Sequence, residues 1–399
     1  MRTAVVGGGA AGFFLAINLK EMMPEMEVVI FERGHRVLKK VEISGGGRCN
    51  CTNTFANVKD LSAVYPRGHR LLKRLMKGFS HEDAYQWFER HGVKLTVQPD
   101  GCVFPALQDS HAIIDCFLNA ARRHSIIIQT GTAIEDPTTL LDEYDSVVVT
   151  TGGQPRADGL RWAESLGIET VSPVPSLFTL RIDDPQLHSL MGTVADEATV
   201  FLPGTKLRAS GPLLLTHWGM SGPAILKLSS YAARLLAEQD YHAMLCVNWT
   251  GQSEADIQQQ LAAIAATHPQ RQLTTMRPHG IVTRLWDYLT NKCLGHRSTA
   301  TWGSLNRKEM NRLTNILIND QYEIAGRAPF RDEFVTCGGI ALSAVHAATL
   351  ESRAVSRIYF AGEVLDIDGI TGGFNFQAVW TTAYTVATAI SNKHSLSSL

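Results

Sequence analysis

The first strand and turn of the chain constrain its fold more than any other feature. An apolar strand at residues 2–6 runs into the turn Gly-Gly-Gly-Ala-Ala-Gly at 7–12, and an apolar helix follows. Gly7 permits a tight turn, Gly9 lets the backbone approach a pyrophosphate, and Gly12 lets the helix pack on the strand. The pattern predicts a dinucleotide-binding βα unit. A turn that serves only a tight strand-to-helix connection is the alternative interpretation.

A second strand supports the nucleotide-binding interpretation. Residues 27–32 read Glu-Val-Val-Ile-Phe-Glu, and the closing acid lies about 20 residues beyond the glycines. Glu32 is placed to accept hydrogen bonds from the ribose hydroxyls of an adenosine. Because an acid at this position repels a 2′-phosphate, the pattern predicts FAD or NAD rather than NADP.

Length and composition bound the remaining possibilities. The chain has 399 residues, 45% apolar and 19% charged, which leaves room for two or three domains. No apolar run has the length of a membrane span, and the first strand begins at residue 2, so we expect a cytoplasmic protein without a signal peptide. Seven scattered cysteines indicate reduced thiols without disulfide partners, and a net charge of −1 argues against electrostatic nucleic-acid binding by the molecule as a whole.

Further along, Ser44-Gly45-Gly46-Gly47-Arg48-Cys49-Asn50 describes a backbone-lined loop beside something flat or anionic. With this loop, the chain resembles a family of bacterial FAD-dependent oxidoreductases that carry GxGAAG, SGGGRCNxTN, ATGG, THxGxSGP and GEvLDxxGxxGGYNfQ. The chain reads GGGAAG, SGGGRCNCTN, TTGG, THWGMSGP and GEVLDIDGITGGFNFQ in the same order, from Gly7 to Gln377. Flavoproteins like aminoacetone oxidase, bile-acid enone reductase and ribosomal RNA dihydrouridine synthase share these motifs. The resemblance implies FAD in a glutathione-reductase-like Rossmann domain.

The motifs predict a set of FAD-binding residues. A buried β-branched strand at 146–150 ends in Thr151-Gly152-Gly153, and ligands of doubly wound sheets lie at such carboxyl ends. The resemblance implies a backbone contact from Ala133 to adenine. The predicted cofactor-binding residues are Gly7, Gly9, Ala10, Ala11, Gly12, Glu32, Arg33, Lys40, Ser44, Gly45, Gly46, Arg48, Cys49, Asn50, Ala133, Thr151, Gly152, Gly153, Gly362, Glu363, Asp366, Gly373, Asn375 and Phe376; no metal ligand is predicted.

A cysteine pair, one aromatic residue and one short connection bear on how far the resemblance extends. Cys49 and Cys51 form a C-x-C rather than a redox C-x-x-C, so we expect small loop residues near the cofactor and no catalytic disulfide. Phe374 stands where the family has Tyr, which puts any role of that hydroxyl in doubt. The connection 154–159 is shorter than in relatives, which reshapes a loop near the FAD and weakens the transfer of a relative's substrate to this chain.

Beyond residue 173 the pattern changes to short alternating strands and turns, which predicts an inserted antiparallel β-domain. Within it, Thr216-His217-Trp218-Gly219 precedes a helix expected over 224–238. His217 is the best general acid–base candidate of the chain, because an imidazole can exchange a proton near neutral pH. A structural histidine that bonds a neighbouring carbonyl is the open alternative.

Two basic runs raise the question of nucleic acid. Residues 67–77 hold five basic side chains without an acid, and a solvated helix face or a phosphate-binding patch would explain them. The segment 271–312 contains eight basic residues and only two acidic ones. Trp286, Tyr288 and Trp302 lie in the same segment. Such a segment can bind polyanions and stack on bases, although core packing is the more common fate of these aromatics.

The sequence therefore predicts an α/β protein of three parts. They are a discontinuous glutathione-reductase-like Rossmann FAD domain at 1–172 plus 338–399, an inserted antiparallel β-domain at 173–250 plus 320–337, and a small helical lobe at 251–319. We expect an FAD-dependent oxidoreductase that reduces an activated C=C bond by hydride from flavin N5. No second G-x-G-x-x-G exists, so NAD(P)H is expected as a transient donor.

The substrate is left open between a small molecule and ribosomal RNA. Three alternatives stand beside small-molecule reduction: a dihydrouridine synthase acting on ribosomal RNA, an oxidase of a small amine or aminoketone, and a non-catalytic flavin-binding regulatory protein.

Overall fold

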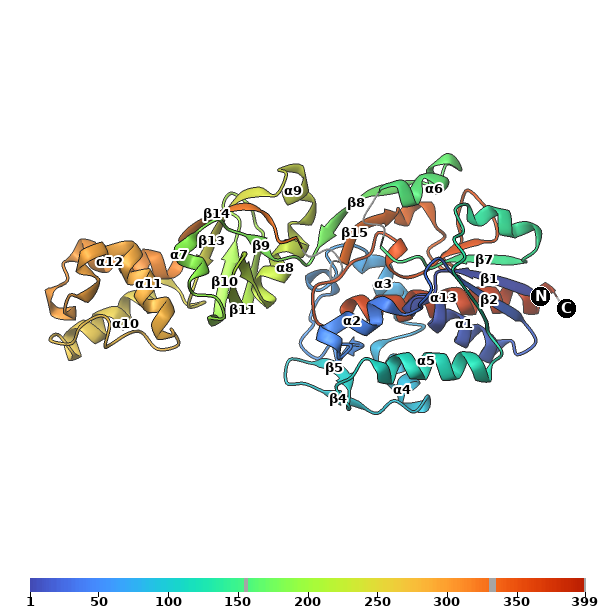
Figure 1. The fold of residues 1–399 in the computed structure, drawn as a ribbon, viewed down its shortest axis with the longest axis horizontal. Helices are drawn as coiled ribbons and strands as arrows, with labels where there is room; N and C mark the ends of the chain where they lie inside the picture. The colour runs from blue at the N-terminus through green and yellow to red at the C-terminus, as the bar shows by residue number, and fades with distance from the viewer. Residues whose placement is uncertain (154–156, 330–334, 398–399) are drawn as a thin grey trace. The chain divides into compact units, whose positions relative to one another are not determined.

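The computed structural model describes residues 1–153, 157–329 and 335–397 and divides the chain into two compact units. The first unit is Met1–Pro175 with Arg331–Leu399, and the second is Ser176–Phe330. Figure 1 draws both as ribbons coloured along the chain. Among the described residues, no helix is both long enough and apolar enough to cross a membrane.

A five-stranded parallel sheet organises the first unit, in the order β16-β7-β1-β2-β6. All four residues of β7 are buried, which is typical of a parallel sheet covered on both faces and explains its run of Val. The strands are β1 (Arg2–Val6), β2 (Glu27–Glu32), β6 (Ile127–Thr130), β7 (Ser146–Val149) and β16 (Ile358–Phe360). The predicted Rossmann-like sheet is confirmed.

The apolar first helix of the chain packs against its last helix. Helix α1 (Ala10–Met22) packs against the long helix α13 (Phe374–Ser397), and Figure 1 shows the blue and red ribbons beside the sheet. Phe14 of α1 meets Trp380 of α13 at 5.0 Å and Trp87 at 4.6 Å between ring centroids. Trp87, Phe88 and Val93 are buried, so this segment packs against the core.

Smaller elements complete the first unit. Strands β3 (Thr52–Asn53), β5 (Cys102–Pro105) and β4 (Leu95–Val97) form an antiparallel sheet, and β8 (Thr170–Ser176) pairs with β15 (Val335–Ile340). Ser80 and Asp83 form a capping box that starts α4. The helices are α2 (Lys39–Gly47), α3 (His69–Leu75), α4 (His81–Arg90), α5 (His111–Arg123) and α6 (Arg161–Ser165).

A closed antiparallel barrel forms the strand part of the second unit, in the order β10-β11-β12-β9-β14-β13. Closure leaves no open sheet edge, which suits short strands with one buried face. The strands are β9 (Leu180–Arg181), β10 (Val194–Phe201), β11 (Arg208–Thr216), β12 (Gly219–Ser221), β13 (His242–Asn248) and β14 (Asp320–Arg327). The predicted antiparallel insertion is thus present as a barrel.

The remaining helices belong to the same unit. They are α7 (Pro185–His188), α8 (Pro223–Tyr231), α9 (Ala233–Glu238), α10 (Glu254–Thr267), α11 (Thr283–Leu294) and α12 (Arg307–Ile318). Trp286 and Trp302 are both buried and stack on each other, with ring centroids 6.1 Å apart. The division of this region into a β-domain and a separate helical lobe stays a prediction.

Local differences from the predicted elements have local causes. Among the short strands expected beyond residue 173, β8 and β9 are separated at Leu177, which adopts a left-handed φ of 58°. The helix expected over 224–238 divides at Ala232, where ψ rises to 7°. Strand β15, expected to close the inserted domain, pairs with β8 instead. The shortened connection begins at residues 154–156, which lie outside the described residues.

Candidate functional site: a dinucleotide-binding turn and a histidine-lined cavity

The turn after β1 depends on two glycines for close packing. Gly7 has a left-handed φ of +119°, and a Cβ there would lie 2.4 Å from the carbonyl oxygen of Thr150. A Cβ on Gly12 would lie 2.1 Å from the carbonyl oxygen of Gly7. Thr150 Oγ1 donates to the same Gly7 oxygen at 2.9 Å. The turn, α1 and the end of β7 therefore touch through backbone, as the sequence predicted.

Gly9 plays a different part from its two neighbours. Its backbone is extended, with φ of −94°, and a Cβ placed on it would meet nothing within 4 Å. Gly9 is also the N-cap of α1. As a glycine it has no side chain to cap the helix, and the first helical turn contains no acidic residue. The unpaired N–H groups of that first turn can donate to phosphate oxygens. The open space and the donors fit the pyrophosphate of FAD.

Glu32 is fixed at the end of β2 by backbone donors. Its Oε2 accepts from the Gly8 N–H at 2.9 Å and its Oε1 accepts from the Gly34 N–H at 2.8 Å. Each carboxylate oxygen has a second lone pair, so the oriented side chain can still accept from ribose hydroxyls. This arrangement fits the adenosine role predicted for Glu32. Arg33 and Ala133 are exposed near the same ends of β2 and β6.

The glycine loop at the end of α2 consists of left-handed backbone. Gly45, Gly46 and Gly47 have φ of 58°, 68° and 81°, which explains why three glycines occur in succession. Arg48 lies over the Phe104 ring at 4.5 Å. A Cβ placed on Gly46 would meet no heavy atom within 4 Å, so the backbone surface there is open.

Cys49 and Cys51 are buried free thiols. Burial raises the pKa of Cys49 to about 12 and also raises the pKa of Cys51. Because the reactive form of cysteine is the thiolate, neither side chain is suited to redox exchange. The Cys51 carbonyl accepts from Trp380 Nε1 at 2.8 Å, which connects this loop to α13.

The loop at 50–53 is joined to the C-terminal motif that precedes α13. Asn53 Nδ2 donates to the Gly372 carbonyl at 2.9 Å, and Thr52 Oγ1 donates to Gln377 Oε1 at 2.6 Å. A Cβ on Gly373 would lie 2.2 Å from the Thr52 oxygen, so only glycine fits. The two motifs, more than 300 residues apart, thus form one surface beside the start of α13.

Further bonds hold the C-terminal motif itself. Asn375 bonds both the N–H and the carbonyl of Gly369, and Phe376 stacks on Trp380. Asp366 lies half-buried, with its N–H donating to the Ile340 carbonyl. The fully buried Asp368, which the sequence did not single out, forms an ion pair with Arg67.

Glu363 and Lys40 form the main ion pair of the predicted cofactor residues. Lys40 Nζ lies 2.9 Å from Glu363 Oε2, and the Thr336 N–H donates to Oε1 at 2.9 Å. Burial acts to raise the pKa of Glu363, but the Lys40 ammonium and the N–H groups of Thr336 and Gly153 keep it below its usual value. A Cβ on Gly153 would lie 2.6 Å from Glu363 Oε1. Gly153 therefore has to be small for this carboxylate to sit where it does.

His217 belongs to the second unit, whereas every predicted cofactor residue belongs to the first. It is exposed in the turn between β11 and β12, where a Cβ on Gly219 would lie 2.5 Å from the Leu180 carbonyl. The turn lines a cavity of about 340 Å³. Its walls are mostly apolar and come from Thr179, Met191, Gly192, Leu214, Leu215, Thr216, His217 and Trp218. Thr179 and Met191 carry no motif, because they lie in the connections before β9 and β10 and come close to the β11–β12 turn only in the folded unit.

Comparison with known proteins identifies the family. Residues 1–389 match the family described as HI0933-like protein Rossmann domain. This chain belongs to that family. The family is one of FAD-dependent oxidoreductases, so the resemblance found in the motifs is confirmed.

Two relatives match nearly the whole flavoprotein. It is 26% identical to the 3-dehydro-bile acid delta(4,6)-reductase of Clostridium scindens, over 98% of this chain and 99% of that protein. It is 25% identical to the ribosomal RNA dihydrouridine synthase of Escherichia coli, over 96% of each. Among solved structures, 3-ketosteroid delta1-dehydrogenase from Sterolibacterium denitrificans aligns over 98% of this chain and 99% of that chain, at 12% identity and a TM-score of 0.47.

Proposed function

We propose that this flavoprotein reduces an electron-poor C=C bond in a small, largely apolar molecule, with NAD(P)H as the transient donor. The observation that carries this proposal is the cavity at the β11–β12 turn, whose mostly apolar lining also contains the His217 imidazole and two threonines. Such a lining buries an apolar ring system and leaves a few polar groups to orient a carbonyl.

Bound FAD supplies the redox chemistry, since it accepts two electrons from a nicotinamide and delivers a hydride from N5. The first unit holds it. The open N-terminus of α1 would hold the pyrophosphate, and Glu32 would hold the ribose. The Lys40–Glu363 pair and the loop of Gly45 and Gly46 complete the predicted site.

The second unit supplies the substrate cavity and a candidate proton donor. Reduction of a C=C bond needs one hydride and one proton, and the proton has to come from a side chain or from water. His217 is exposed to the cavity, and its ring lies 5.0 Å from that of Trp218. Within the part of the chain that the structure describes, no hydrogen bond joins the His217 ring to a carbonyl, which favours a proton donor over a purely structural histidine.

Ribosomal RNA is the less favoured substrate, because the aromatics proposed for base stacking are buried. Trp286 and Trp302 donate through Nε1 to the carbonyls of Leu273 and Met276. Tyr288 is 8% exposed. Rings held in this way are not free to stack on bases.

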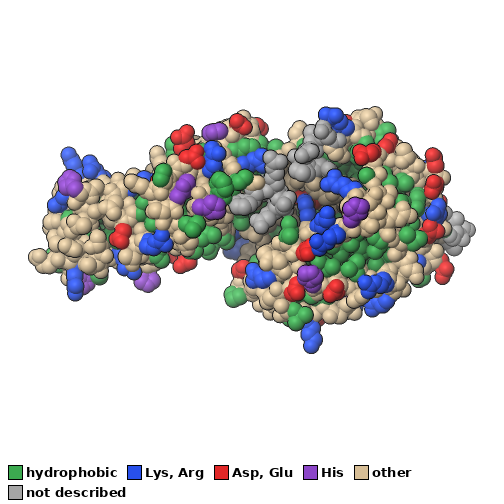
Figure 2. Space-filling view, viewed as in Figure 1, with side chains coloured by type: hydrophobic (Ala, Val, Ile, Leu, Met, Phe, Trp, Pro, Cys, Tyr) green, Lys and Arg blue, Asp and Glu red, His purple; other side chains and the backbone are tan. Residues whose placement is uncertain are grey.

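The ion pairs of this region are a second reason why ribosomal RNA is the less favoured substrate. Arg297 is paired with Glu309 at 3.0 Å and Lys292 with Asp320 at 2.7 Å. On the face shown in Figure 2, the basic side chains over α10–α12 stand apart, with uncharged surface between them. Exposed Arg307 and Lys308 remain the main candidates for a phosphate contact.

Anaerobic photometry tests the proposal. The FAD-loaded protein is reduced with NADH or NADPH, and the flavin absorbance is followed after addition of a steroid-like 4-en-3-one, ribosomal RNA or oxygen. We expect stoichiometric reoxidation by the enone. Reoxidation by RNA alone would support the dihydrouridine synthase, and peroxide release with an amine and no use of NAD(P)H would support an oxidase. A stable flavin spectrum with every donor and acceptor would support a regulatory protein.

A further inference from the structure

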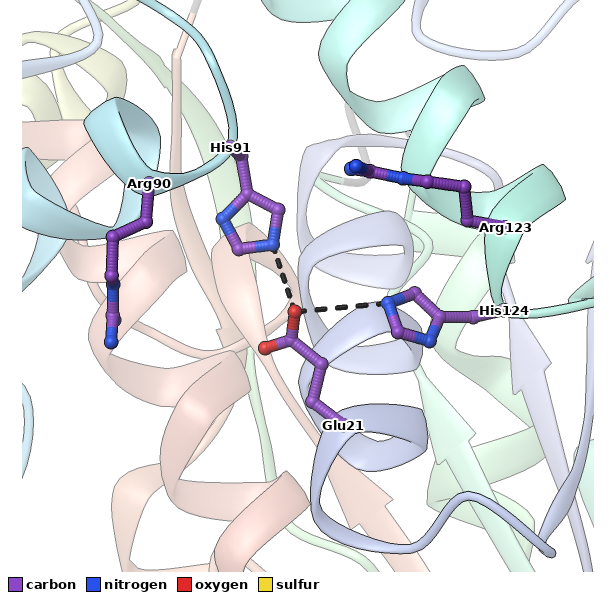
Figure 3. Close-up of a pocket in the computed structure, with 5 residues that line it drawn as sticks. All are labelled: Glu21, Arg90, His91, Arg123 and His124. Carbon is purple, nitrogen blue, oxygen red and sulfur yellow. Dashed lines mark hydrogen bonds and ion pairs between the residues drawn. The ribbon is translucent and has the colours of Figure 1, made fainter.

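A second cavity lies in the first unit, at the far end of α1 from the cofactor turn. It has a volume of about 500 Å³ and is lined by Glu21, Arg90, His91, Arg123 and His124 (Figure 3). Gly9 caps the start of α1 and Glu21 lies in its last turn. At 1.5 Å rise per residue the two positions are roughly 18 Å apart, so this cavity is distinct from the proposed FAD site.

The lining side chains come from the C-terminal ends of three helices. Arg90 ends α4 and His91 is its C-cap, while Arg123 ends α5 and His124 is its C-cap. Carbonyl groups at helix C-termini favour nearby cations. This effect explains why basic residues occur here, and it predicts that they contribute to stability whether or not a ligand binds.

Glu21 brings a carboxylate to the cavity wall, and that carboxylate is already engaged. Its Oε1 lies 2.9 Å from His91 Nε2 and 3.7 Å from His124 Nε2, as the dashed lines in Figure 3 show. The hydrogen bond to His91 keeps the pKa of Glu21 below its usual value. His91 is itself fixed, because Nδ1 bonds the Trp87 carbonyl at 2.7 Å and the ring stacks on Trp87.

The two arginines are left without such partners. Across residues 1–153, 157–329 and 335–397, no side-chain hydrogen bond or ion pair is made by Arg90 or Arg123. Their neighbour Arg122 does bond, donating to Asn119 Oδ1 at 2.9 Å. In Figure 3, Arg90 and Arg123 lie on opposite sides of the Glu21–His91 pair. Two permanent positive charges therefore border one hollow whose carboxylate is held by His91.

We propose that this cavity binds a small anion through a phosphate group, either inorganic phosphate or a phosphomonoester. A guanidinium fork matches the spacing of phosphate oxygens and forms charge-assisted hydrogen bonds with them. His124 lines the same wall, and an imidazole can donate a hydrogen bond to a phosphate oxygen. The volume accommodates a phosphate with a small attached group.

Calorimetric titration of the FAD-loaded protein at fixed ionic strength tests the proposal, with inorganic phosphate and glycerol phosphate as probes. We expect saturable binding to the wild type and affinity weaker by about tenfold or more in the Arg90→Gln/Arg123→Gln variant, because two charge-assisted contacts are lost. Arg122→Gln is the matched control and should bind as the wild type does. Tighter binding of glycerol phosphate than of phosphate would show that the attached group is held.

Two results would overturn the proposal: no saturable binding of either probe, or equal affinity in the wild type and the double variant. A lower melting temperature in the double variant is expected from the lost helix-end charges alone, so the ligand-dependent change is the quantity compared. If the double variant does not fold, Arg123→Lys replaces it. That variant keeps the charge, loses the fork, and should bind phosphate more weakly.

Discussion

The candidate sites of the two compact units are built in different ways. In the first, the turn proposed for the cofactor offers backbone N–H groups and open space at Gly9. In the second, the cavity beside His217 is lined by the end of β11 and by residues of the turns and connections next to β9, β10 and β12. A backbone site demands glycines at fixed spacing, whereas a side-chain cavity tolerates many combinations of residues. The proposed cofactor turn is therefore visible in the sequence as a motif, whereas the cavity beside His217 is not.

The largest expected effect comes from filling the space at Gly9. In Gly9→Val the backbone is already extended and the new side chain meets nothing in the folded protein, so the fold should persist while the pyrophosphate is blocked. We expect bound FAD to fall below about a tenth of the wild-type content. Absorbance of the purified protein measures it. Gly78→Val, at a surface turn away from the motifs, is the control, and stoichiometric FAD in Gly9→Val would mean that the turn is not the cofactor site.

The second prediction concerns the other unit. His217→Ala should leave FAD content unchanged and lower the rate of enone reduction by about 100-fold, if the imidazole delivers the proton. The flavin should still be reduced by NAD(P)H at the wild-type rate. Steady-state and stopped-flow kinetics separate the two half-reactions. An unchanged enone rate would leave His217 with only a structural role.

A smaller effect is expected for the partly exposed ion pair between Lys40 and Glu363. Its folded pKa lies below its usual value, so its stabilisation is fully present above the unfolded pKa of about 4.3. That stabilisation is lost as the pH falls through the folded pKa. Glu363→Gln should lower the free energy of unfolding at pH 7 by about 1–3 kcal/mol. It should also reduce the decrease in that free energy between neutral and acidic pH.

Urea unfolding between neutral and acidic pH measures the effect of Glu363→Gln. Glu42→Gln, which breaks the exposed pair with Arg36, is the control and should cost less than about 1 kcal/mol. Equal losses in the two variants would show that the Lys40–Glu363 pair has no special role.

The smallest effect should follow from charge reversal of Arg307, Lys308 and Arg312. A small-molecule reductase should keep its enone rate and its FAD, because these side chains belong to α12 and line neither the cofactor turn nor the His217 cavity. RNA binding would weaken and lose part of its salt dependence if the segment serves RNA. Dihydrouridine in ribosomal RNA from cells with each variant, or without the protein, distinguishes the two substrates, and altered content would contradict the small-molecule proposal.

Much of the first unit could be predicted from the sequence, because its geometry depends on residue types that few alternatives replace. Gly7, Gly12 and Gly373 each face a backbone oxygen at a distance that excludes a Cβ, so they are fixed in the sequence as motifs. The parallel sheet was likewise visible in the Val-rich strands.

The rest of the molecule depends on long-range pairing that leaves no local pattern. Thr179 and Met191 come close to the His217 turn only in the folded unit, and β15 pairs with β8 rather than with the barrel. The Arg67–Asp368 pair joins residues that lie far apart in the sequence, and the charge pattern alone places Arg67 in a basic run. The burial of Trp286 and Trp302 could not be predicted either. The two rings stack on each other, and the presence of aromatic residues in a basic segment does not reveal this contact.

Product analysis tests the central claim most directly, namely that the flavoprotein adds hydrogen to an electron-poor C=C bond. The wild type, Gly9→Val and His217→Ala are each incubated without oxygen with NAD(P)H and a steroid-like 4-en-3-one, and the product is identified by mass spectrometry. We predict a product heavier by two hydrogens from the wild type, little from His217→Ala and none from Gly9→Val. Unchanged enone from a wild type that oxidises NAD(P)H or reduces uridine in ribosomal RNA would contradict the claim.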